Sequence, residues 1–191
     1  MKFSFGCSLV YHVPSPMPFV FNVEAASFIG QTIQQEQLST EPPLPVERWT
    51  MPETGNRYLR VLAQTGDLRL RYDAEVVLEP RVEDPATVIE VLAAKLPFEV
   101  MTHLYPSRYC QADKLVRFAH STFSNLAPGY HRVNGICNWI RENVEYQFGI
   151  SDALTSAFDT VTERAGVCRD FAHLAIALCR AMGIPARYVS A

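Results

Sequence analysis

Cys168 is the residue in this chain with the clearest capacity for chemistry, and it lies at the start of a predicted helix. Apolar residues recur after it at Phe171 and Leu174, the spacing of one helical face. Gly183 and Pro185 predict the end of this helix, because glycine accepts a left-handed backbone and proline cannot continue the hydrogen-bond pattern. The sequence therefore places a thiol in the first turn of a helix.

A thiol in this position can serve as a nucleophile, because the thiolate is the reactive form and a helix N-terminus favours it. No Ser, Thr, Asp or Asn directly precedes Cys168 as an N-cap, so the first backbone N–H groups are expected to be free. The helix dipole contributes only about 0.3–1 kcal/mol, less than one pKa unit, so catalysis also needs a histidine. The alternative is that Cys168 is a small buried apolar residue, as free cysteines often are.

Several stretches of the sequence share their order and spacing with one enzyme family. They are PSRYC at 106–110, WIRENVEY at 139–146, TSAFD at 155–159, GVCRDFA at 166–172 and ALCRAMGIPARYVS at 177–190. In this order they resemble the bacterial transglutaminase-like superfamily, over residues 97–190. The resemblance implies a papain-like core in which a cysteine opens a helix and a histidine and an aspartate follow on strands. Cys168 matches the catalytic nucleophile of that family.

The resemblance also implies a reaction. Cys168 would attack an amide carbonyl and form a thioester, and its own backbone N–H would help to bind the oxyanion. Water as the acceptor makes such an enzyme a peptidase or amidase, whereas an amine makes it a transglutaminase. Bacterial relatives more often resemble hydrolases, so we favour a cysteine peptidase or amidase acting on a protein or peptide. The alternative is a non-catalytic protein-binding module that retains the fold; neither hypothesis implies a cofactor.

The sequence departs from the family pattern after Cys168. His173 is the only histidine that follows, and helical geometry places it about 140° around the helix, away from the thiol. The catalytic His and Asp of the family are expected beyond Ala191, so we predict that the chain is C-terminally truncated and inactive by itself. A strand is predicted at Tyr188 and Val189, and its unpaired edge favours a homodimer.

Composition narrows the class of protein. The 191 residues carry a net charge of −3, which predicts no basic surface for nucleic acid. No apolar run approaches the length of about 18 residues that a membrane span needs, and the N-terminus lacks the features of a secretory signal. Five cysteines without a Cys-x-x-Cys motif argue against a disulfide framework and a zinc site. A cytoplasmic protein without a bound metal is the expectation.

The predicted fold class is α+β, with two domains. Residues 1–80 are expected to form an antiparallel β domain, a sandwich or a barrel, because residues 68–78 alternate apolar and charged side chains. Residues 81–191 are expected to form the transglutaminase-like domain, incomplete at its C-terminus. Further strands are predicted at 4–12, 19–24, 32–38 and 58–63, and helices at 113–124, 131–143 and 156–165.

Other details of the second domain follow from the same patterns. Residues 88–94 are predicted to form a short helix or a strand. Cys137 and Cys179 fall on apolar stripes, so both are expected to be buried and to react with iodoacetamide more slowly than Cys168. Asp170 is interpreted as a structural carboxylate in the first helical turn. Arg169 and Arg187 can form ion pairs with Asp170 or with the sheet edge, and the sequence does not decide between these partners.

Overall fold

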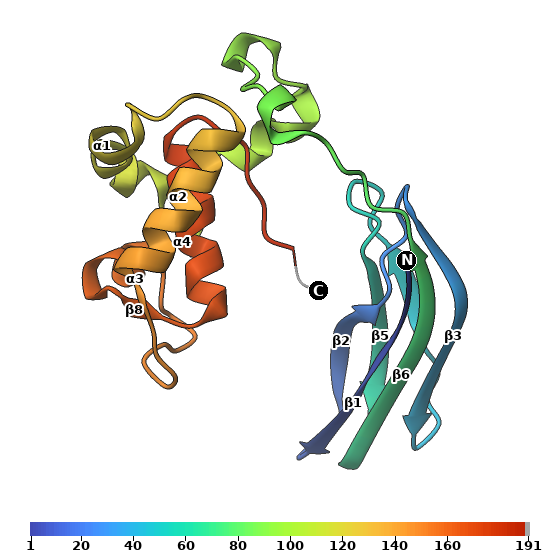
Figure 1. Cartoon of the computed structure of the whole chain (residues 1–191). Coiled ribbons are helices and arrows are strands. Elements are labelled where there is room, and N and C mark those ends of the chain that lie inside the picture. Colours follow the sequence, from blue (N-terminus) through green and yellow to red (C-terminus); the bar gives the residue numbers. More distant parts are fainter. Residues whose placement is uncertain (190–191) are drawn as a thin grey trace. The chain divides into compact units, whose positions relative to one another are not determined.

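The computed structural model describes residues 1–189; Ser190 and Ala191 lie outside the described part. The chain divides into two compact units, Met1–Val82 and Glu83–Ala191 (Figure 1). Each unit has its own apolar core. The first unit consists of strands and the second mainly of helices, which is the α+β class that the sequence predicted.

The first unit contains two antiparallel sheets of three strands each. One sheet has the order β1 (Lys2–Val13), β6 (Gly66–Leu78), β3 (Gln31–Glu41), and the other has the order β2 (Met17–Glu24), β5 (Arg57–Ala63), β4 (Glu47–Thr50). Side chains from both sheets share one buried cluster, so the unit is a sandwich rather than a barrel. No helix occurs in residues 1–82, all of which the structure describes, and this confirms the prediction for that region.

The core of the first unit follows from the alternation in β6. This strand is central in its sheet, and its side chains Leu68, Leu70 and Tyr72 are fully buried. The arginines and acids between them face solvent, as the period of two requires. Strand β4 escaped prediction because its four residues are all exposed and therefore carry no apolar alternation.

A charged cluster joins the two sheets. Arg57 in β5 donates to both carboxylate oxygens of Glu36 in β3, at 2.7 and 2.9 Å. It also lies 3.1 Å from the buried carboxylate of Glu24 in β2, an ion pair without hydrogen-bond alignment. The Tyr72 hydroxyl donates to Glu36 at 2.8 Å and accepts the N–H of Ala25 at 3.0 Å. Burial raises the pKa of Tyr72 to about 12, and the bond from Arg57 lowers the pKa of Glu36.

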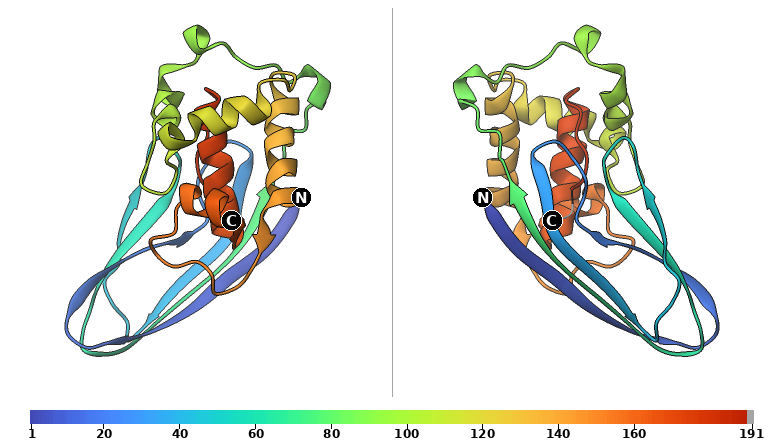
Figure 2. Two further views of the ribbon diagram at one scale, coloured as in Figure 1. Left: turned by 90° about the vertical axis from the view of Figure 1, so that its left-hand side faces the viewer. Right: turned by 90° about the vertical axis from the view of Figure 1, so that its right-hand side faces the viewer.

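The second unit gathers its helices around one central helix. They are α1 (Ala112–Phe123), α2 (Tyr130–Asn143), α3 (Ala157–Glu163) and α4 (Cys168–Ala181), and α4 contacts each of the other three (Figure 2). Leu174 and Leu178 of α4 are fully buried beside Phe123 of α1 and Ile136 of α2. The helical spacing in the sequence therefore predicted the correct faces, to within two residues at most helix ends.

Part of the segment between the sandwich and α1 differs from its prediction. Residues 88–92 are neither helix nor strand, and only residues 93 and 94 of the predicted element are helical, in a short 3₁₀ helix. The segment contains three 3₁₀ helices, namely η1 (Pro85–Thr87), η2 (Ala93–Lys95) and η3 (Phe98–Leu104). Their exposed apolar side chains lack the neighbours that stabilise a longer helix. Glu90 fastens this segment to α2, since its carboxylate accepts from Arg132 at 2.6 and 2.8 Å.

The strand predicted at Tyr188 and Val189 is absent from residues 1–189. The chain turns back after α4 at Gly183, whose φ of 78° lies in the left-handed region. The guanidinium of Arg180 then holds the carbonyl of Ala186 at 2.7 and 2.9 Å. The Ala186 N–H also donates to the His103 carbonyl of η3 at 3.1 Å. The Arg180 side chain and η3, rather than a neighbouring strand, therefore hold the extended segment after α4.

Candidate functional site

Cys168 is the first residue of α4, and its side chain is exposed. The preceding Val167 has extended backbone angles and cannot cap the helix with its own side chain. Within residues 1–189, the thiol of Cys168 makes no hydrogen bond or ion pair, and its backbone N–H has no acceptor. The first turn of α4 thus presents a free thiol beside a free N–H donor, as the sequence predicted.

Two very short parallel strands bring the chain to Cys168. Strand β8 (Ala165–Gly166) pairs with β7 (Glu145–Tyr146), which follows α2. The bonds from Glu145 N–H to the Arg164 carbonyl and from Gln147 N–H to the Gly166 carbonyl measure 2.8 and 3.0 Å. Sequence reasoning missed both strands because two residues cannot show a periodic pattern.

Arg164 ends α3 in a conformation that non-glycine residues seldom adopt. Its φ of 58° lies in the left-handed region, which costs about 1 kcal/mol or more for a residue with a Cβ. Its guanidinium lies 4.7 Å from the ring centroid of Trp139 on α2, a cation–π geometry that offsets part of this strain. The sharp turn at Arg164 directs the chain into β8 and so towards Cys168.

Asp170 fixes the first turn of α4 from the inside. Its side chain is 0% exposed, and one carboxylate oxygen accepts the Val167 N–H at 2.9 Å. The other oxygen lies 3.3 Å from Arg169, an ion pair that was one of the alternatives left open by the sequence. A Cβ on Gly166 would lie 2.9 Å from the Asp170 Cβ, so glycine is required for this close approach. Asp170 is therefore structural, as predicted, and acts as a substitute N-cap.

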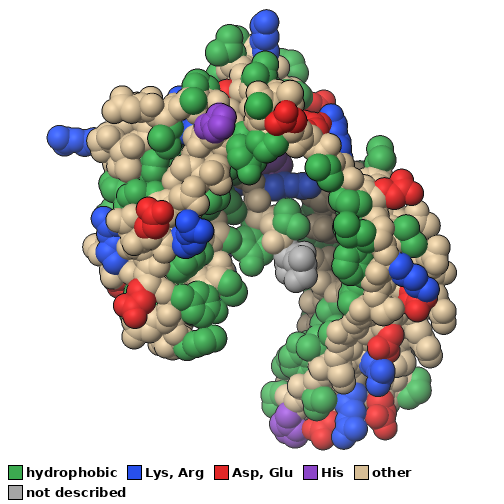
Figure 3. Space-filling view, viewed as in Figure 1, with side chains coloured by type: hydrophobic (Ala, Val, Ile, Leu, Met, Phe, Trp, Pro, Cys, Tyr) green, Lys and Arg blue, Asp and Glu red, His purple; other side chains and the backbone are tan. Residues whose placement is uncertain are grey.

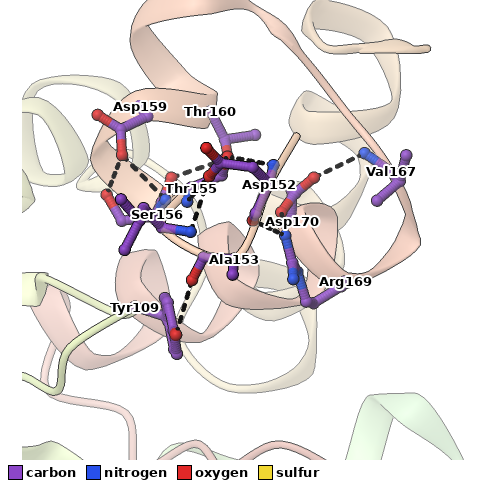
Figure 4. A network of polar contacts seen from close by, with 11 residues as sticks. Tyr109, Asp152, Ala153, Thr155, Ser156, Asp159, Thr160, Val167, Arg169 and Asp170 are labelled. Atoms are coloured by element: carbon purple, nitrogen blue, oxygen red, sulfur yellow. Dashed lines mark hydrogen bonds and ion pairs between the residues drawn. The ribbon is translucent and has the colours of Figure 1, made fainter. Parts of the chain in front are cut away.

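The loop before α3 is connected to the same turn (Figure 4). Arg169 donates to the Asp152 carbonyl at 2.6 Å, and the Tyr109 hydroxyl donates to the Ala153 carbonyl at 2.8 Å. The Asp152 carboxylate accepts the N–H groups of Leu154 and Thr155, and these bonds lower its pKa. Because Arg169 and Asp152 are both engaged here, the network holds the loop against the start of α4.

A second cap positions α3 within this network. The backbone N–H and the hydroxyl of Ser156 both donate to Asp159, at 2.9 and 2.6 Å. This reciprocal arrangement lowers the pKa of Asp159, with the hydroxyl bond as the main cause. The Ala157 N–H donates to the Tyr109 carbonyl at 2.8 Å, which joins α3 to the segment before α1. A serine three residues before an acid was the sequence signal for this cap.

His173 has no contact with the thiol. Its ring stacks on Tyr109 with centroids 5.2 Å apart and nearly parallel planes, and it also lies 5.6 Å from the ring of Tyr188. Burial and the nearby Arg169 lower its pKa, so the ring is neutral at pH 7. This agrees with the helical geometry that placed His173 away from Cys168.

The other cysteines differ from Cys168 in exposure and in acidity. Cys110 and Cys179 are buried, and burial raises the pKa of both thiols, to about 12 for Cys179. Cys137 is exposed, so the prediction that it is buried was wrong. Helix α2 buries Ile136 and Ile140 in the core of the second unit, whereas Cys137 between them lies on the exposed side of the helix.

No other feature of the described residues competes with Cys168 as a reactive centre. Residues 1–189 hold no group of three or more His, Cys, Asp or Glu side chains arranged for a metal ion. None of their helices combines the length and apolar character that crossing a membrane requires. Two grooves of about 510 and 540 Å³ border the loop at residues 43–46, and only residues of the first unit line them.

Comparison with known proteins decides the family. Residues 116–191 match the transglutaminase-like superfamily, and residues 1–97 match the N-terminal domain of bacterial transglutaminase. The chain belongs to the bacterial transglutaminase-like superfamily. The family assignment made from the sequence is thereby confirmed.

Similar proteins of known sequence or structure agree with this assignment. A crystal structure described as "a Putative Cysteine Protease from Cytophaga hutchinsonii" is 42% identical, with a TM-score of 0.92 over 97% of this chain and 65% of that one. An uncharacterized protein of Mycobacterium leprae is 44% identical over 87 residues, which are 46% of this chain and 31% of the relative. An uncharacterized protein of Mycobacterium tuberculosis is 33% identical over 78 residues, 41% of this chain and 25% of the relative. The chain thus spans less than two thirds of each.

Proposed function

We propose that this protein is a thiol-dependent enzyme acting on amide bonds, a cysteine peptidase or amidase with Cys168 as the nucleophile. The observation that carries the proposal is the exposed, unbonded thiol at the first residue of α4. The family and the neighbour described as a cysteine protease support it. A non-catalytic binding module would not need a free thiol beside a free N–H donor.

The proposed reaction proceeds in two steps. The Cys168 thiolate attacks the amide carbonyl carbon, the C–N bond breaks, and the leaving amine takes up a proton. The product is a thioester on Cys168, which water then hydrolyses to a carboxylic acid and the free thiol. The backbone N–H of Cys168 is the donor proposed for the oxyanion formed in each step. Water is the proposed acceptor, because the protease-like neighbour favours hydrolysis over transfer to an amine.

The general base stays unassigned among the histidines that the structure describes. His173 stacks on Tyr109, His12 pairs with Asp67, and no imidazole in residues 1–189 bonds to the thiol. The resemblance places the family's histidine and aspartate after the nucleophile. General-base catalysis typically supplies about 10²–10⁴-fold in rate. The absence of amidase and transglutaminase activity in the 191-residue chain therefore stays a prediction, and we propose acylation of Cys168 by an activated ester as the step that can be measured in it.

The same observations bear on the substrate, the cellular location and the oligomeric state of the proposed enzyme. A protein or peptide is the proposed substrate, and the net charge of −3 gives no reason to expect a nucleic acid partner. All five cysteines are free, which supports a reducing, cytoplasmic location. Association of two copies through residues 188–189 stays a prediction that gel filtration of the chain can test.

An acyl-transfer experiment tests the function. The chain is incubated with p-nitrophenyl acetate, and peptide mapping by mass spectrometry locates the acetyl thioester. We expect the adduct on Cys168 and its loss in Cys168→Ser, whereas Cys137→Ser, which removes another exposed thiol, leaves it unchanged. Adduct formation on Cys137 before Cys168 contradicts the assignment of Cys168. A rate of acetylation of Cys168 and Cys137 no higher than that of free N-acetylcysteine contradicts it as well.

A further inference from the structure

An exposed aromatic cluster borders the proposed nucleophile. It consists of Tyr146 at the end of β7, Phe148 in the following loop and Phe171 in α4. The ring centroids of Tyr146 and Phe148 are 5.2 Å apart, and those of Tyr146 and Phe171 are 6.0 Å apart, both in edge-to-face geometry. Figure 3 shows hydrophobic side chains at the surface over this end of the second unit.

The backbone fixes this cluster next to Cys168. Phe171 follows Cys168 by three residues on the same helix, which brings their Cβ atoms to about 5–6 Å. Tyr146 pairs with Gly166 between β7 and β8, and Gly166 precedes Cys168 by two residues. The aromatic rings therefore lie near the first turn of α4, where Cys168 begins the helix, and His173 lies on another face of α4.

The cluster is not explained by the core of the second unit. Phe171 packs partly against that core, but Tyr146 and Phe148 do not belong to it. Their side chains are 49% and 83% exposed, so a large part of each ring stays in contact with water and adds nothing to the burial of apolar surface. Single exposed apolar residues are common, whereas here Tyr146 contacts the rings of both Phe148 and Phe171 near a free thiol, and such a surface is suited to a ligand.

The charges around the cluster favour a neutral, apolar ligand. Arg169 is bound to the Asp170 carboxylate and the Asp152 carbonyl. The Asp152 carboxylate is occupied by backbone N–H groups of its own loop. Neither charged side chain is left to recognise an ionic group on a substrate. Aromatic faces and edges instead complement an aliphatic or aromatic side chain.

We propose that Tyr146, Phe148 and Phe171 form the specificity subsite for the acyl donor, which accepts an apolar, preferably aromatic, side chain next to the amide that Cys168 attacks. This inference rests on the proposed function. Phe171 is the fixed wall of the subsite, because the core holds it, and Phe148 is its adaptable edge. Binding of the ring excludes water from the thiol side and orients the carbonyl towards Cys168.

Two alkylating reagents of equal chemistry and different shape test the subsite in the chain itself. Iodoacetamide and N-benzyl iodoacetamide react with Cys168, and each rate constant is divided by that of N-acetylcysteine with the same reagent. We expect a normalised preference for the benzyl reagent of about fivefold, the gain from removing about 40 Å² of ring surface from water. Phe148→Ala should abolish most of this preference, and Phe148→Leu should retain part of it.

The control and the contrary outcomes are distinct. Phe98→Ala removes another exposed ring of the second unit, 91% exposed, and should leave the preference unchanged. Equal normalised rates for the two reagents in the unmodified chain, or a preference that survives both Phe148→Ala and Phe171→Ala, overturn the subsite. Failure of the proposed function looks different: Cys168 then reacts with iodoacetamide no faster than Cys137, whatever the benzyl reagent does.

Discussion

Removal of the Asp170 carboxylate should loosen the turn that presents Cys168. Asp170→Ala deletes the acceptor of the Val167 N–H and the partner of Arg169 while leaving the helix sequence otherwise intact. Asp170→Asn retains the shape and one acceptor oxygen but loses the negative charge. Comparing the two variants separates the contribution of the cap from that of the charge.

The magnitude follows from how deeply each partner is buried. Loss of the capping acceptor, which leaves the partly buried Val167 N–H without a partner, costs about 1–2 kcal/mol. The ion pair adds little, because the Arg169 side chain is 37% exposed and keeps its bond to the Asp152 carbonyl. We therefore expect Asp170→Ala to lower the free energy of unfolding of the second unit by about 2 kcal/mol, and Asp170→Asn by about half of that.

Urea titration followed by tryptophan fluorescence measures this change. Trp139 lies in the second unit and Trp49 in the first, so a Trp49→Phe background reports on the second unit alone. A loss of about 2 kcal/mol shifts the midpoint by about 1–2 M urea for a unit of this size. A shift below about 0.3 M for Asp170→Ala, or an equal effect of both variants, would refute the cap as the reason for burying this carboxylate.

Three further predictions concern other parts of the chain. Gly166→Ala should lower the free energy of unfolding of the second unit by about 1–3 kcal/mol in the same titration, because the new Cβ would lie 2.9 Å from that of Asp170. Acid should destabilise the first unit, because Arg57 lowers the pKa of Glu36 in the folded state below 4.5. The contribution of the ionised Glu36 to stability is fully present above pH 4.5 and is lost as the pH falls through the pKa of the folded state. Acid unfolding followed by circular dichroism should therefore depend less on pH in Glu36→Gln. Iodoacetamide mapping at pH 7.5 should label Cys168 long before Cys179, whose pKa is raised by burial to about 12; comparable rates would show that α4 opens readily.

The sequence predicted those parts of the fold that periodicity controls. In β6, every second side chain from Leu68 is apolar, and the structure buries that face. In α4, the helical stripe predicted both the start at Cys168 and the face that carries Leu174 and Leu178 into the core. Both elements span enough residues for the apolar period to be recognised even where single positions depart from it.

The remaining parts depend on contacts that no local pattern records. Cys137 is exposed although its neighbour Ile136 is buried, so tertiary packing decides which part of the apolar stripe of α2 is covered. The extended chain at Tyr188 has strand-forming residues, but the structure shows it fastened by Arg180 instead of paired. The candidate site shows the same division, since Cys168 was predicted from its motif whereas Tyr146 and Phe148 come to it through the β7–β8 pair.

The packing of Gly166 against Asp170 also restricts how this corner of the protein can evolve. The Asp170 side chain occupies the space that a Cβ at position 166 would need, so the two positions cannot change independently. Replacing Gly166 first produces a clash, and replacing Asp170 first by a residue without a side-chain acceptor leaves the Val167 N–H unpaired. Either order of mutation passes through a less stable intermediate, which selection on abundance removes. The turn that carries the thiol is thus separated from alternative sequences by a fitness valley, even where those sequences would themselves fold.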